Sequence, residues 1–285
     1  MITFYKLGTY GRLGNQFFQY AALKSLAIKN NYKLKILSNE STSWHGQKFL
    51  LPEFNLIEEQ MHPSEMQYIK NFYEESPKTD YSFFSLPDNT NINGFFQHRF
   101  YFEDILYKLK EIFTLKQSYI DKAKEEFKEI QKYRNNNKII SVHIRLGDII
   151  RDNSLYYSNT KFIENLTTYL EKAINSIGSK NDFFIFTGGS RCQLGQEKND
   201  IEICKFLLKN INANFIFSEG NDTLIDFQLM RMCDDNILSP LSTYSLWVGY
   251  LAESTKMIIV PKDYFFNTEK NKNTDNLYLD NWIKI

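Results

Sequence analysis

The sequence lacks the features that mark several large classes of protein. Its 34 Lys and Arg residues balance its 34 Asp and Glu residues, which leaves a formal net charge of zero. Without a basic field the chain cannot hold nucleic acid or an anionic membrane by its overall charge, so any anion site must be local. No apolar run approaches the length of about 18 residues that predicts a membrane-spanning helix, and the N-terminal segment has no signal-peptide pattern. We therefore expect a cytoplasmic protein that binds no nucleic acid.

Residues that commonly bind metals or form disulfides are few. The three cysteines, Cys192, Cys204 and Cys233, form neither a disulfide framework nor a paired zinc motif. The four histidines show no ligand spacing. The sequence also has no Asp-x-Asp tripeptide to hold a divalent ion beside a nucleotide diphosphate. It therefore predicts no metal site and no other cofactor.

Strand-like and helix-like segments alternate along the chain. An apolar content of 42% is enough to bury a core, and the length corresponds to roughly two domains. The opening predicts a strand, a glycine loop, a helix and a second strand, which together make a β-α-β unit. Residues 40–103 are rich in aromatic residues, are broken by prolines, and show no regular pattern. The four opening segments are Ile2–Leu7, Gly11–Gln16, Phe17–Ile28 and Lys33–Leu37.

From the linker Asn135–Asn137 onward the alternation is regular, which predicts a parallel sheet with helices on both faces. We expect an α/β fold of two Rossmann-like halves facing a central cleft, with ligands at the carboxyl ends of the strands. The expected parts are residues 1–136, residues 137–263 and a tail, 264–285, that packs back on the domains. The expected helices are Asp104–Phe113, Ser118–Tyr133, Thr160–Ile177, Asp200–Lys209, Thr223–Met232 and Tyr244–Glu253. The expected strands are Lys138–Ile144, Asp182–Thr187, Asn214–Phe217, Asn236–Leu238 and Lys256–Val260.

The first candidate site is the segment Gly11–Gln19. Gly11 and Gly14 allow positive φ and a close approach of the backbone to a ligand. Asn15 and Gln16, at the expected helix start, offer side-chain amides and backbone N–H groups to phosphate oxygens. An ordinary tight turn with a helix cap explains the same residues equally well, because short glycine loops are common.

The second candidate site is His143–Asp148, which follows an apolar strand. This order places polar groups at the carboxyl end of a central strand, with His143 and Arg145 on one face. The guanidinium of Arg145 is a cation that can bind a phosphate with its planar fork of N–H donors. The purely structural alternative is a salt bridge between Arg145 and Asp148 that stabilises the turn.

The third candidate site is the pair of hydroxyl residues Ser242 and Thr243, which follow Pro240 and precede an apolar helix. Their position suits a helix N-cap. A pyrophosphate could take the place of the capped group, because the helix dipole favours negative charge there.

Taken together and in this order, these segments resemble the bacterial α-1,2-fucosyltransferase family, glycosyltransferase family 11. The family patterns are G-G-L-G-N-Q-M-F-Q-Y-A, G-Y-F-Q with Y-F, H-x-R-R-G-D, an Asp before L-M-x-x-C, and N-S-S/T-F/Y-S-W-W-A-A-Y-L. The resemblance extends from Gly11 to about Pro261. The similar segments here are Gly11–Ala21, Gly94–Gln97 with Tyr101 and Phe102, His143–Asp148, Asp226–Cys233 and Ser242–Leu251.

The resemblance implies a GT-B fold, GDP-fucose as donor, inversion at the anomeric carbon and no required metal. It implies that Arg145 holds the donor phosphates together with two hydroxyl groups, while the first glycine loop closes over the pyrophosphate. Asp226 is expected to contact guanine or ribose, and a solvated helical residue is the alternative. The expected donor-binding residues are Gly14, Asn15, Gln16, Arg145, Asp226, Ser242 and Thr243.

The expected reaction moves fucose to the 2-hydroxyl of galactose in a lipopolysaccharide-type or lipid-linked glycan, with peripheral contact to the inner membrane. Arg145 would stabilise the leaving GDP, and the general base is either His143 or Asp148, unless both only support Arg145. Aromatic rings of residues 42–103 would stack on the acceptor. One alternative is a transferase of the same scaffold with another linkage or donor. Another is a noncatalytic module that binds a GDP-sugar or a glycan.

Four departures from the family patterns motivate these alternatives. The second Arg of the signature is Leu146, the Asn before the serine is Leu241, and the first Trp is Leu246. An acidic pair is replaced by Thr187–Ser190. The first arginine and the hydroxyl pair are retained, so we keep the expected activity, while the changes put donor affinity and donor identity in question.

Overall fold

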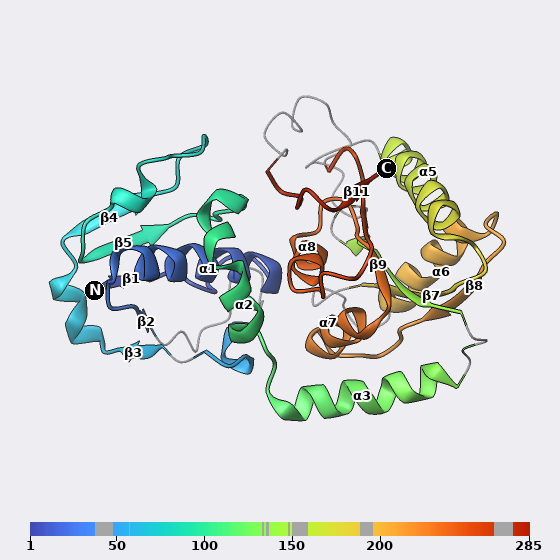
Figure 1. Ribbon diagram of the computed structural model, residues 1–285, viewed down its shortest axis with the longest axis horizontal. Helices are drawn as coiled ribbons and strands as arrows, with labels where there is room; N and C mark the ends of the chain where they lie inside the picture. The colour runs from blue at the N-terminus through green and yellow to red at the C-terminus, as the bar shows by residue number, and fades with distance from the viewer. Residues whose placement is uncertain are drawn as a thin grey trace. The chain divides into compact units, whose positions relative to one another are not determined.

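The computed structural model describes residues 1–37, 48–56, 58–132, 134, 137–147, 149, 159–188, 196–264 and 276–285. The chain divides into two compact units, Met1–Lys116 and Gln117–Ile285. The division expected from the sequence lies later in the chain, between residues 136 and 137. The difference arises from helix α3 (Gln117–Gln131), which packs against helix α7 (Thr223–Met232) and so belongs to the second unit (Figure 1).

The first unit is built on short parallel strands (Figure 1). Strand β5 lies between β1 and β4, and β2 pairs with β3. An isolated parallel bridge between Ile2 and Leu34 joins the two sheets, in the order β3-β2-β1-β5-β4. The strands are β1 (Ile2–Thr3), β2 (Lys35–Leu37), β3 (Glu59–Met61), β4 (Asn71–Glu74) and β5 (Thr90–Asn93). Short helices lie between them, η2 (Leu51–Glu53), η3 (Pro63–Tyr68) and η4 (Phe83–Ser85), and η5 (Arg99–Tyr101), η6 (Glu103–Ile105) and α2 (Leu106–Ile112) follow β5.

Helix α1 (Leu13–Asn30) is the central element of this unit. Its apolar residues recur at helical spacing, and Phe17, Tyr20 and Leu23 are completely buried. The helix ends at Asn31, whose φ of 54° is in the left-handed region that asparagine tolerates. The strand expected over Ile2–Leu7 is short because only its first two residues have a pairing partner; turns follow it.

Several aromatic residues of the segment 40–103 form the core of the first unit. The rings of Phe83, Phe96 and Tyr101 meet one another with centroids 4.9, 5.1 and 5.5 Å apart. The Phe96 ring also meets that of Phe4 at 6.1 Å, edge to face. Such pairs stabilise a fold by about 0.5–1.5 kcal/mol beyond their buried area. Phe95, in contrast, keeps 42% of its surface exposed.

The second unit contains a six-stranded parallel sheet in the order β11-β10-β9-β6-β7-β8. Strands β6 and β7 lie side by side over six residues, from Ile139 opposite Asp182 to Ile144 opposite Thr187. The strands are β6 (Ile139–Ile144), β7 (Asp182–Thr187), β8 (Asn214–Phe217), β9 (Asp235–Ile237), β10 (Ile258–Val260) and β11 (Ile283–Lys284). The helices, besides α3 and α7, are α5 (Asn159–Ile177), α6 (Gln196–Leu208) and α8 (Thr243–Tyr250).

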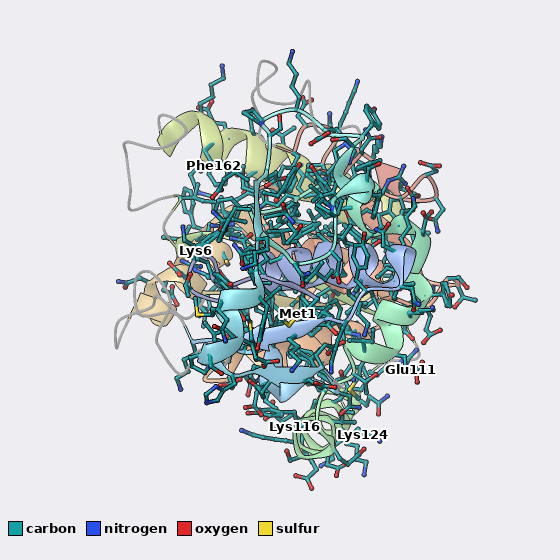
Figure 2. The ribbon with its side chains drawn as sticks, turned by 90° about the vertical axis from the view of Figure 1, so that its left-hand side faces the viewer. Met1, Lys6, Glu111, Lys116, Lys124 and Phe162 are labelled. Atoms are coloured by element: carbon teal, nitrogen blue, oxygen red, sulfur yellow. The ribbon has the colours of Figure 1, made fainter. Side chains whose placement is uncertain are left out.

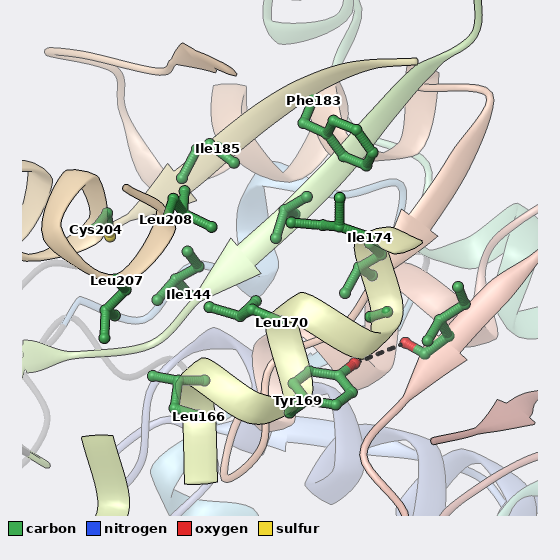
Figure 3. Close-up of a cluster of buried hydrophobic side chains, with 14 of the residues drawn as sticks. Ile144, Leu166, Tyr169, Leu170, Ile174, Phe183, Ile185, Cys204, Leu207 and Leu208 are labelled. Carbon is green, nitrogen blue, oxygen red and sulfur yellow. Dashed lines mark hydrogen bonds between the residues drawn. The ribbon is translucent and has the colours of Figure 1, made fainter. Parts of the chain in front are cut away.

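One face of this sheet carries a hydrophobic cluster (Figure 3). Alternate residues of β6, Ile140, Val142 and Ile144, point into it and meet the apolar face of α5. The hydroxyl of Tyr169 donates hydrogen bonds to the carbonyl of Leu238 at 2.7 Å and to that of Ile259 at 3.2 Å. The buried phenol is thus satisfied, and it ties α5 to the segments around β9 and β10.

The last described segment completes the sheet, because β11 pairs with β10. Trp282 packs against Gly249 and Tyr250 of α8, and a Cβ added at Gly249 would lie 2.7 Å from the indole ring. The expected tail is therefore part of the second unit. On α3, Phe127 and Ala123 are buried, while charged residues such as Lys124 project outward (Figure 2). Within the described residues, no helix is both long enough and apolar enough to cross a membrane.

Candidate functional site

The order of the strands places a ligand site in the second unit at the carboxyl ends of β6 and β9. On one side of β6 the chain proceeds to β7 and β8, and on the other side to β9, β10 and β11. Ligands of open parallel sheets bind where the strand order reverses in this way. Arg145 directly follows β6, and the segment Leu238–Ser242 directly follows β9. The second and third candidate sites of the sequence are therefore brought together here.

Arg145 is fixed at this edge by two contacts with the segment after β9. Its backbone N–H donates to Oγ of Ser239 at 2.9 Å. Its Nη1 donates to the carbonyl of Leu241, immediately before α8. The residue is half-buried, and its guanidinium is a cation. A permanent positive charge therefore lies at the start of α8, where the helix dipole adds to it.

Ser242 and Thr243 form the first turn of α8, as the sequence predicted. Ser242 is the N-cap: its Oγ accepts a hydrogen bond from the N–H of Ser245 at 3.2 Å, and the residue is 1% exposed. Its hydroxyl therefore already serves the helix. Thr243 is half-buried at the first helical position. Leu241, before them, has a φ of 56°, a left-handed conformation that the family's asparagine would adopt more readily.

His143 lies in β6 on the sheet face opposite the hydrophobic cluster. Its ring is 5.5 Å from that of Tyr244, and Nδ1 has no hydrogen-bond partner among the described residues. Burial, and secondarily the charge of Arg145, lowers the pKa of His143 to about 3. The imidazole is therefore neutral near pH 7. Such a low pKa also makes it a weak proton acceptor.

Two further residues of the signature, Leu146 and Asp148, follow Arg145 in the sequence. Leu146 is completely buried in the hydrophobic cluster. This position, where the family has a second arginine, is therefore part of the core and makes no contribution to the charge at the edge. Asp148, the other candidate base, lies outside the described residues.

Asp226 lies in the first turn of α7. Its Oδ1 accepts a hydrogen bond from Oγ of Ser218 at 2.7 Å, and the residue is half-buried. The helix is capped by Asp222, which accepts from the N–H of Leu224 at 2.8 Å. The hydroxyl of Tyr244 donates to the carbonyl of Thr223 at 2.7 Å. This bond ties the start of α7 to α8, so Asp226 belongs to the same end of the unit as Arg145.

In the first unit, the glycine loop leads directly into α1. Gly11 has a φ of 86°, and a Cβ there would lie 2.5 Å from Cβ and Nδ2 of Asn15, so only glycine fits. Arg12 takes the N-cap position without a side-chain cap. Gly14, in the first turn, is buried. Because Arg12 provides no side-chain cap, a bound anion could accept hydrogen bonds from N–H groups in the first turn of α1.

The two amides of this loop are engaged with other segments of the first unit. Gln16 is completely buried; its Nε2 donates to the carbonyl of Lys48 at 2.9 Å, and its Oε1 accepts from the N–H of Leu50 at 2.9 Å. Its side chain therefore holds the 48–50 segment in place. Asn15 is half-buried, and its Oδ1 accepts from Nε2 of Gln97 at 2.9 Å. The Nδ2 group of Asn15 is the more suitable donor to a ligand.

The sequence did not reveal the residues that support this loop. Tyr10 donates from its hydroxyl to Oδ1 of Asn93 at 2.6 Å, and Glu75 accepts from the N–H groups of Phe95 and Phe96 at 2.7 and 2.8 Å. The Gly94–Gln97 motif pointed to this region, but nothing in the local pattern indicated Glu75. Its role depends on the pairing of β4 with β5.

The fold of the chain is that of the GT-B fucosyltransferases. FUT1 from Arabidopsis thaliana, in a complex with GDP, aligns with a TM-score of 0.55 and 8% identity over 91% of this chain and 70% of that one. The fucosyltransferase NodZ from Bradyrhizobium aligns with a TM-score of 0.51 and 13% identity over 88% of this chain and 92% of that one. The expected α/β fold of the GT-B type is thus confirmed.

The sequence profile described as Glycosyl transferase family 11 matches residues 2–285. The chain belongs to this family, and it is a glycosyltransferase. It is 26% identical over 309 residues to an α-1,2-colitosyltransferase from Escherichia coli, and the alignment covers 96% of each chain. It is 22% identical over 293 residues to galactoside α-(1,2)-fucosyltransferase 1 from Homo sapiens, with 96% of this chain and 73% of that one covered. The resemblance seen in the sequence motifs is confirmed.

Proposed function

We propose that this glycosyltransferase moves L-fucose from GDP-fucose to the 2-hydroxyl of a galactose residue in a glycan, with inversion and without a metal ion. The observation that carries the proposal is the position of Arg145. It lies at the reversal of the strand order, held against the start of α8, in a chain that matches family 11 throughout. The GDP and fucose named for structural relatives are consistent with this donor.

The reaction develops negative charge on the departing nucleotide. The acceptor O-2 attacks the anomeric carbon of fucose, the bond from that carbon to the β-phosphate oxygen breaks, and its electron pair leaves with GDP. Arg145 and the N-terminus of α8 provide fixed positive charge to the leaving phosphate. Ser242 would contribute mainly by capping that helix, and Thr243 by its backbone and hydroxyl. Donors that are already positioned replace the divalent ion that other nucleotide-sugar enzymes use.

The acceptor proton must go to a general base. With a pKa of about 3, His143 is better suited to orient its neighbours as a neutral ring than to accept this proton. We therefore favour Asp148 for the role. Within the same proposal, the first turn of α1 binds the pyrophosphate, through the backbone N–H of Gly14 and through Nδ2 of Asn15. Gln16 fixes the shape of that turn. Asp226 contacts guanine or ribose.

The test is the release of GDP from GDP-fucose with a panel of β-galactosides, followed by linkage analysis of the product. Arg145→Ala is expected to lower kcat about 10²–10³-fold, the range found when one transition-state donor is removed. Arg134→Ala is the matched control, because Arg134 pairs with Asp234 at 3.2 Å, at the amino ends of β6 and β9, opposite the carboxyl ends where Arg145 lies. EDTA is expected to leave the rate unchanged. Loss of turnover in EDTA, or full activity of Arg145→Ala, would contradict the mechanism.

A second candidate donor follows from the Escherichia coli relative, which is named for the transfer of colitose. The departures from the family pattern, among them Leu146, are what put donor identity in question. GDP-fucose, GDP-colitose and GDP-mannose should be compared as donors at equal concentration. Preference for GDP-fucose supports the main proposal, and preference for GDP-colitose supports the second. Tight binding of GDP without transfer to any galactoside would instead indicate a noncatalytic module.

The setting of the reaction is also part of the proposal. The resemblance to bacterial enzymes favours a surface glycan of the lipopolysaccharide type, built on a lipid carrier at the cytoplasmic face of the inner membrane. Transfer to purified lipid-linked glycan in vesicles, compared with transfer to free oligosaccharides, tests this. Equal kinetic constants for the two acceptors would remove the case for a membrane-associated substrate.

A further inference from the structure

A polar and aromatic cluster lies at the carboxyl ends of the strands of the first unit, and the donor chemistry does not use it. Glu75 directly follows β4, Gly94 directly follows β5, and Tyr10 lies in the turns after β1. Strands β1, β5 and β4 are parallel neighbours, so these segments lie at the same edge of the sheet. Ligands of parallel sheets bind at this edge.

The carboxylate of Glu75 is held in a fixed position with one oxygen still available. Oε2 accepts hydrogen bonds from two consecutive N–H groups, those of Phe95 at 2.7 Å and Phe96 at 2.8 Å. Oε1 accepts no hydrogen bond from the described residues and is not sealed from solvent. A rigid carboxylate oxygen of this kind is a strong acceptor for a hydroxyl group. Partial burial raises the pKa of Glu75.

The segment that Glu75 holds has a strained backbone. Phe96 has a φ of 53°, which is rare for a bulky residue, and its ring is completely buried. Gly94 has a φ of 154°, and a Cβ there would lie 2.4 Å from Cβ of Glu75. Strain of this sort persists only where surrounding contacts impose it, and it is concentrated at binding sites. Here it leaves Phe95 on the surface, 42% exposed.

The neighbours of Phe95 fix the plane of its ring and limit what can bind. The Tyr10 ring packs edge to face against it with the ring centroids 5.1 Å apart, and the Tyr10 hydroxyl donates a hydrogen bond to Oδ1 of Asn93. Nδ2 of Asn93 in turn donates to both oxygens of Glu74. Two carboxylates beside an exposed ring repel phosphate and favour a neutral ligand with hydroxyl groups.

We propose that Phe95 and Glu75 form the acceptor subsite, in which a neutral galactoside stacks the apolar face of its sugar ring on Phe95 and donates a hydroxyl to Oε1 of Glu75. The inference rests on the proposed function and assigns the acceptor to named residues. The link from Nε2 of Gln97 to Asn15 connects this subsite with the start of α1, in the same unit. Both residues determine specificity by contact with the sugar, and neither carries the proton transfer.

The experiment measures binding of methyl β-galactoside to the full chain by saturation-transfer NMR, and binding of GDP by calorimetry. Phe95→Leu is expected to raise the galactoside Kd about fivefold by removing the stacking ring. Glu75→Gln retains an oxygen for the two N–H groups but loses the charge, and about a tenfold rise is expected. Phe72→Leu, at a 71% exposed phenylalanine within β4, is the matched control and should change nothing. The GDP Kd should be unchanged in all three variants.

Each outcome separates this inference from the proposed function. Wild-type galactoside Kd in Phe95→Leu and Glu75→Gln would overturn the subsite, even if the wild type transfers fucose normally. If the variants lose galactoside binding and GDP binding together, the substitutions have disrupted the fold of the loop, and this result would also overturn the proposed subsite. Galactoside binding that depends on Phe95 and Glu75 in a chain that does not use GDP-fucose would leave the subsite standing and refute the donor. Absence of galactoside binding to the wild type would refute the subsite.

Discussion

Arg145 and Leu146 are adjacent residues with opposite surroundings. The side chain of Arg145 lies at the edge of the sheet against the start of α8, and that of Leu146 is completely buried in the hydrophobic cluster. The family signature has arginine at both positions, so the sequence alone left open whether Leu146 weakens the donor site. Its burial indicates that the position contributes to packing in this chain.

Restoring the second arginine should therefore be harmful. Leu146→Arg would place a charge without a partner in the hydrophobic cluster, and we expect it to lower the free energy of unfolding by about 3 kcal/mol or more. Leu146→Met keeps the volume and should lower it by less than about 1.5 kcal/mol. Denaturant unfolding of both variants measures this. A stable Leu146→Arg variant with increased activity would show that the position faces the donor.

His143 predicts a dependence of stability on pH. Its folded pKa of about 3 lies below its ordinary value of 6.5, so between these values the unfolded chain binds a proton that the folded chain does not. Stability should therefore fall as the pH is lowered through this window, by about 1.6 kcal/mol from pH 6.5 to pH 5. His143→Gln should reduce this slope, measured by urea unfolding of the second unit at several pH values. The exposed His62 provides the control, and an unchanged slope in His143→Gln would contradict the burial of a neutral imidazole.

At the scale of elements, the best predictions from sequence were those in which local pattern and tertiary structure agree. β7 was predicted with its observed bounds, and β6 within one residue, because these strands are buried on both faces of a parallel sheet and consist largely of apolar residues. Strands β4 and β5 were missed, because Asn71–Glu74 and Thr90–Asn93 are short and mostly polar, and they exist as strands only through long-range pairing. The position of Glu75 could not be predicted for the same reason.

The start of α8 shows how one element serves both structure and the proposed site. Ser242→Ala removes the N-cap, and we expect a decrease in the free energy of unfolding of about 1 kcal/mol. Ser242→Thr should retain most of the stability, because threonine can accept the same hydrogen bond. The GDP Kd of Ser242→Ala should rise with the loss of the cap. Normal stability in Ser242→Ala would mean that the bond to Ser245 does not support the helix.

At the scale of the whole molecule, the chain consists of two units whose proposed functions differ. The second unit carries Arg145 and α8, so GDP should stabilise this unit directly. A ligand at 100 times its Kd adds about 2.7 kcal/mol to the stability of the folded state that binds it. In scanning calorimetry, GDP should raise the transition of the second unit, and Arg145→Ala should abolish the increase. An equal shift in Arg145→Ala would place the nucleotide elsewhere.

The general layout of the molecule was predictable, but the division into units was not. Glycine and proline breaks, together with the alternation of segments, indicated two α/β parts. The boundary was placed at the polar run around Asn135, where a linker is typical. Packing of α3 on α7 moves it to Lys116. A charged amphipathic helix gives no indication in its own sequence of which neighbour covers its apolar side.

The pairing of β6 with β9 has a consequence for how the enzyme matures. Arg145 and Ser239, which meet at the proposed donor site, are separated by 94 residues in sequence. Contacts between such distant positions form slowly, because a long loop must close before they stabilise the chain. Newly made protein should therefore acquire nucleotide affinity only late in refolding, after most helical content has returned. The delay would make GDP capture a convenient signal that the central sheet has reached its native order.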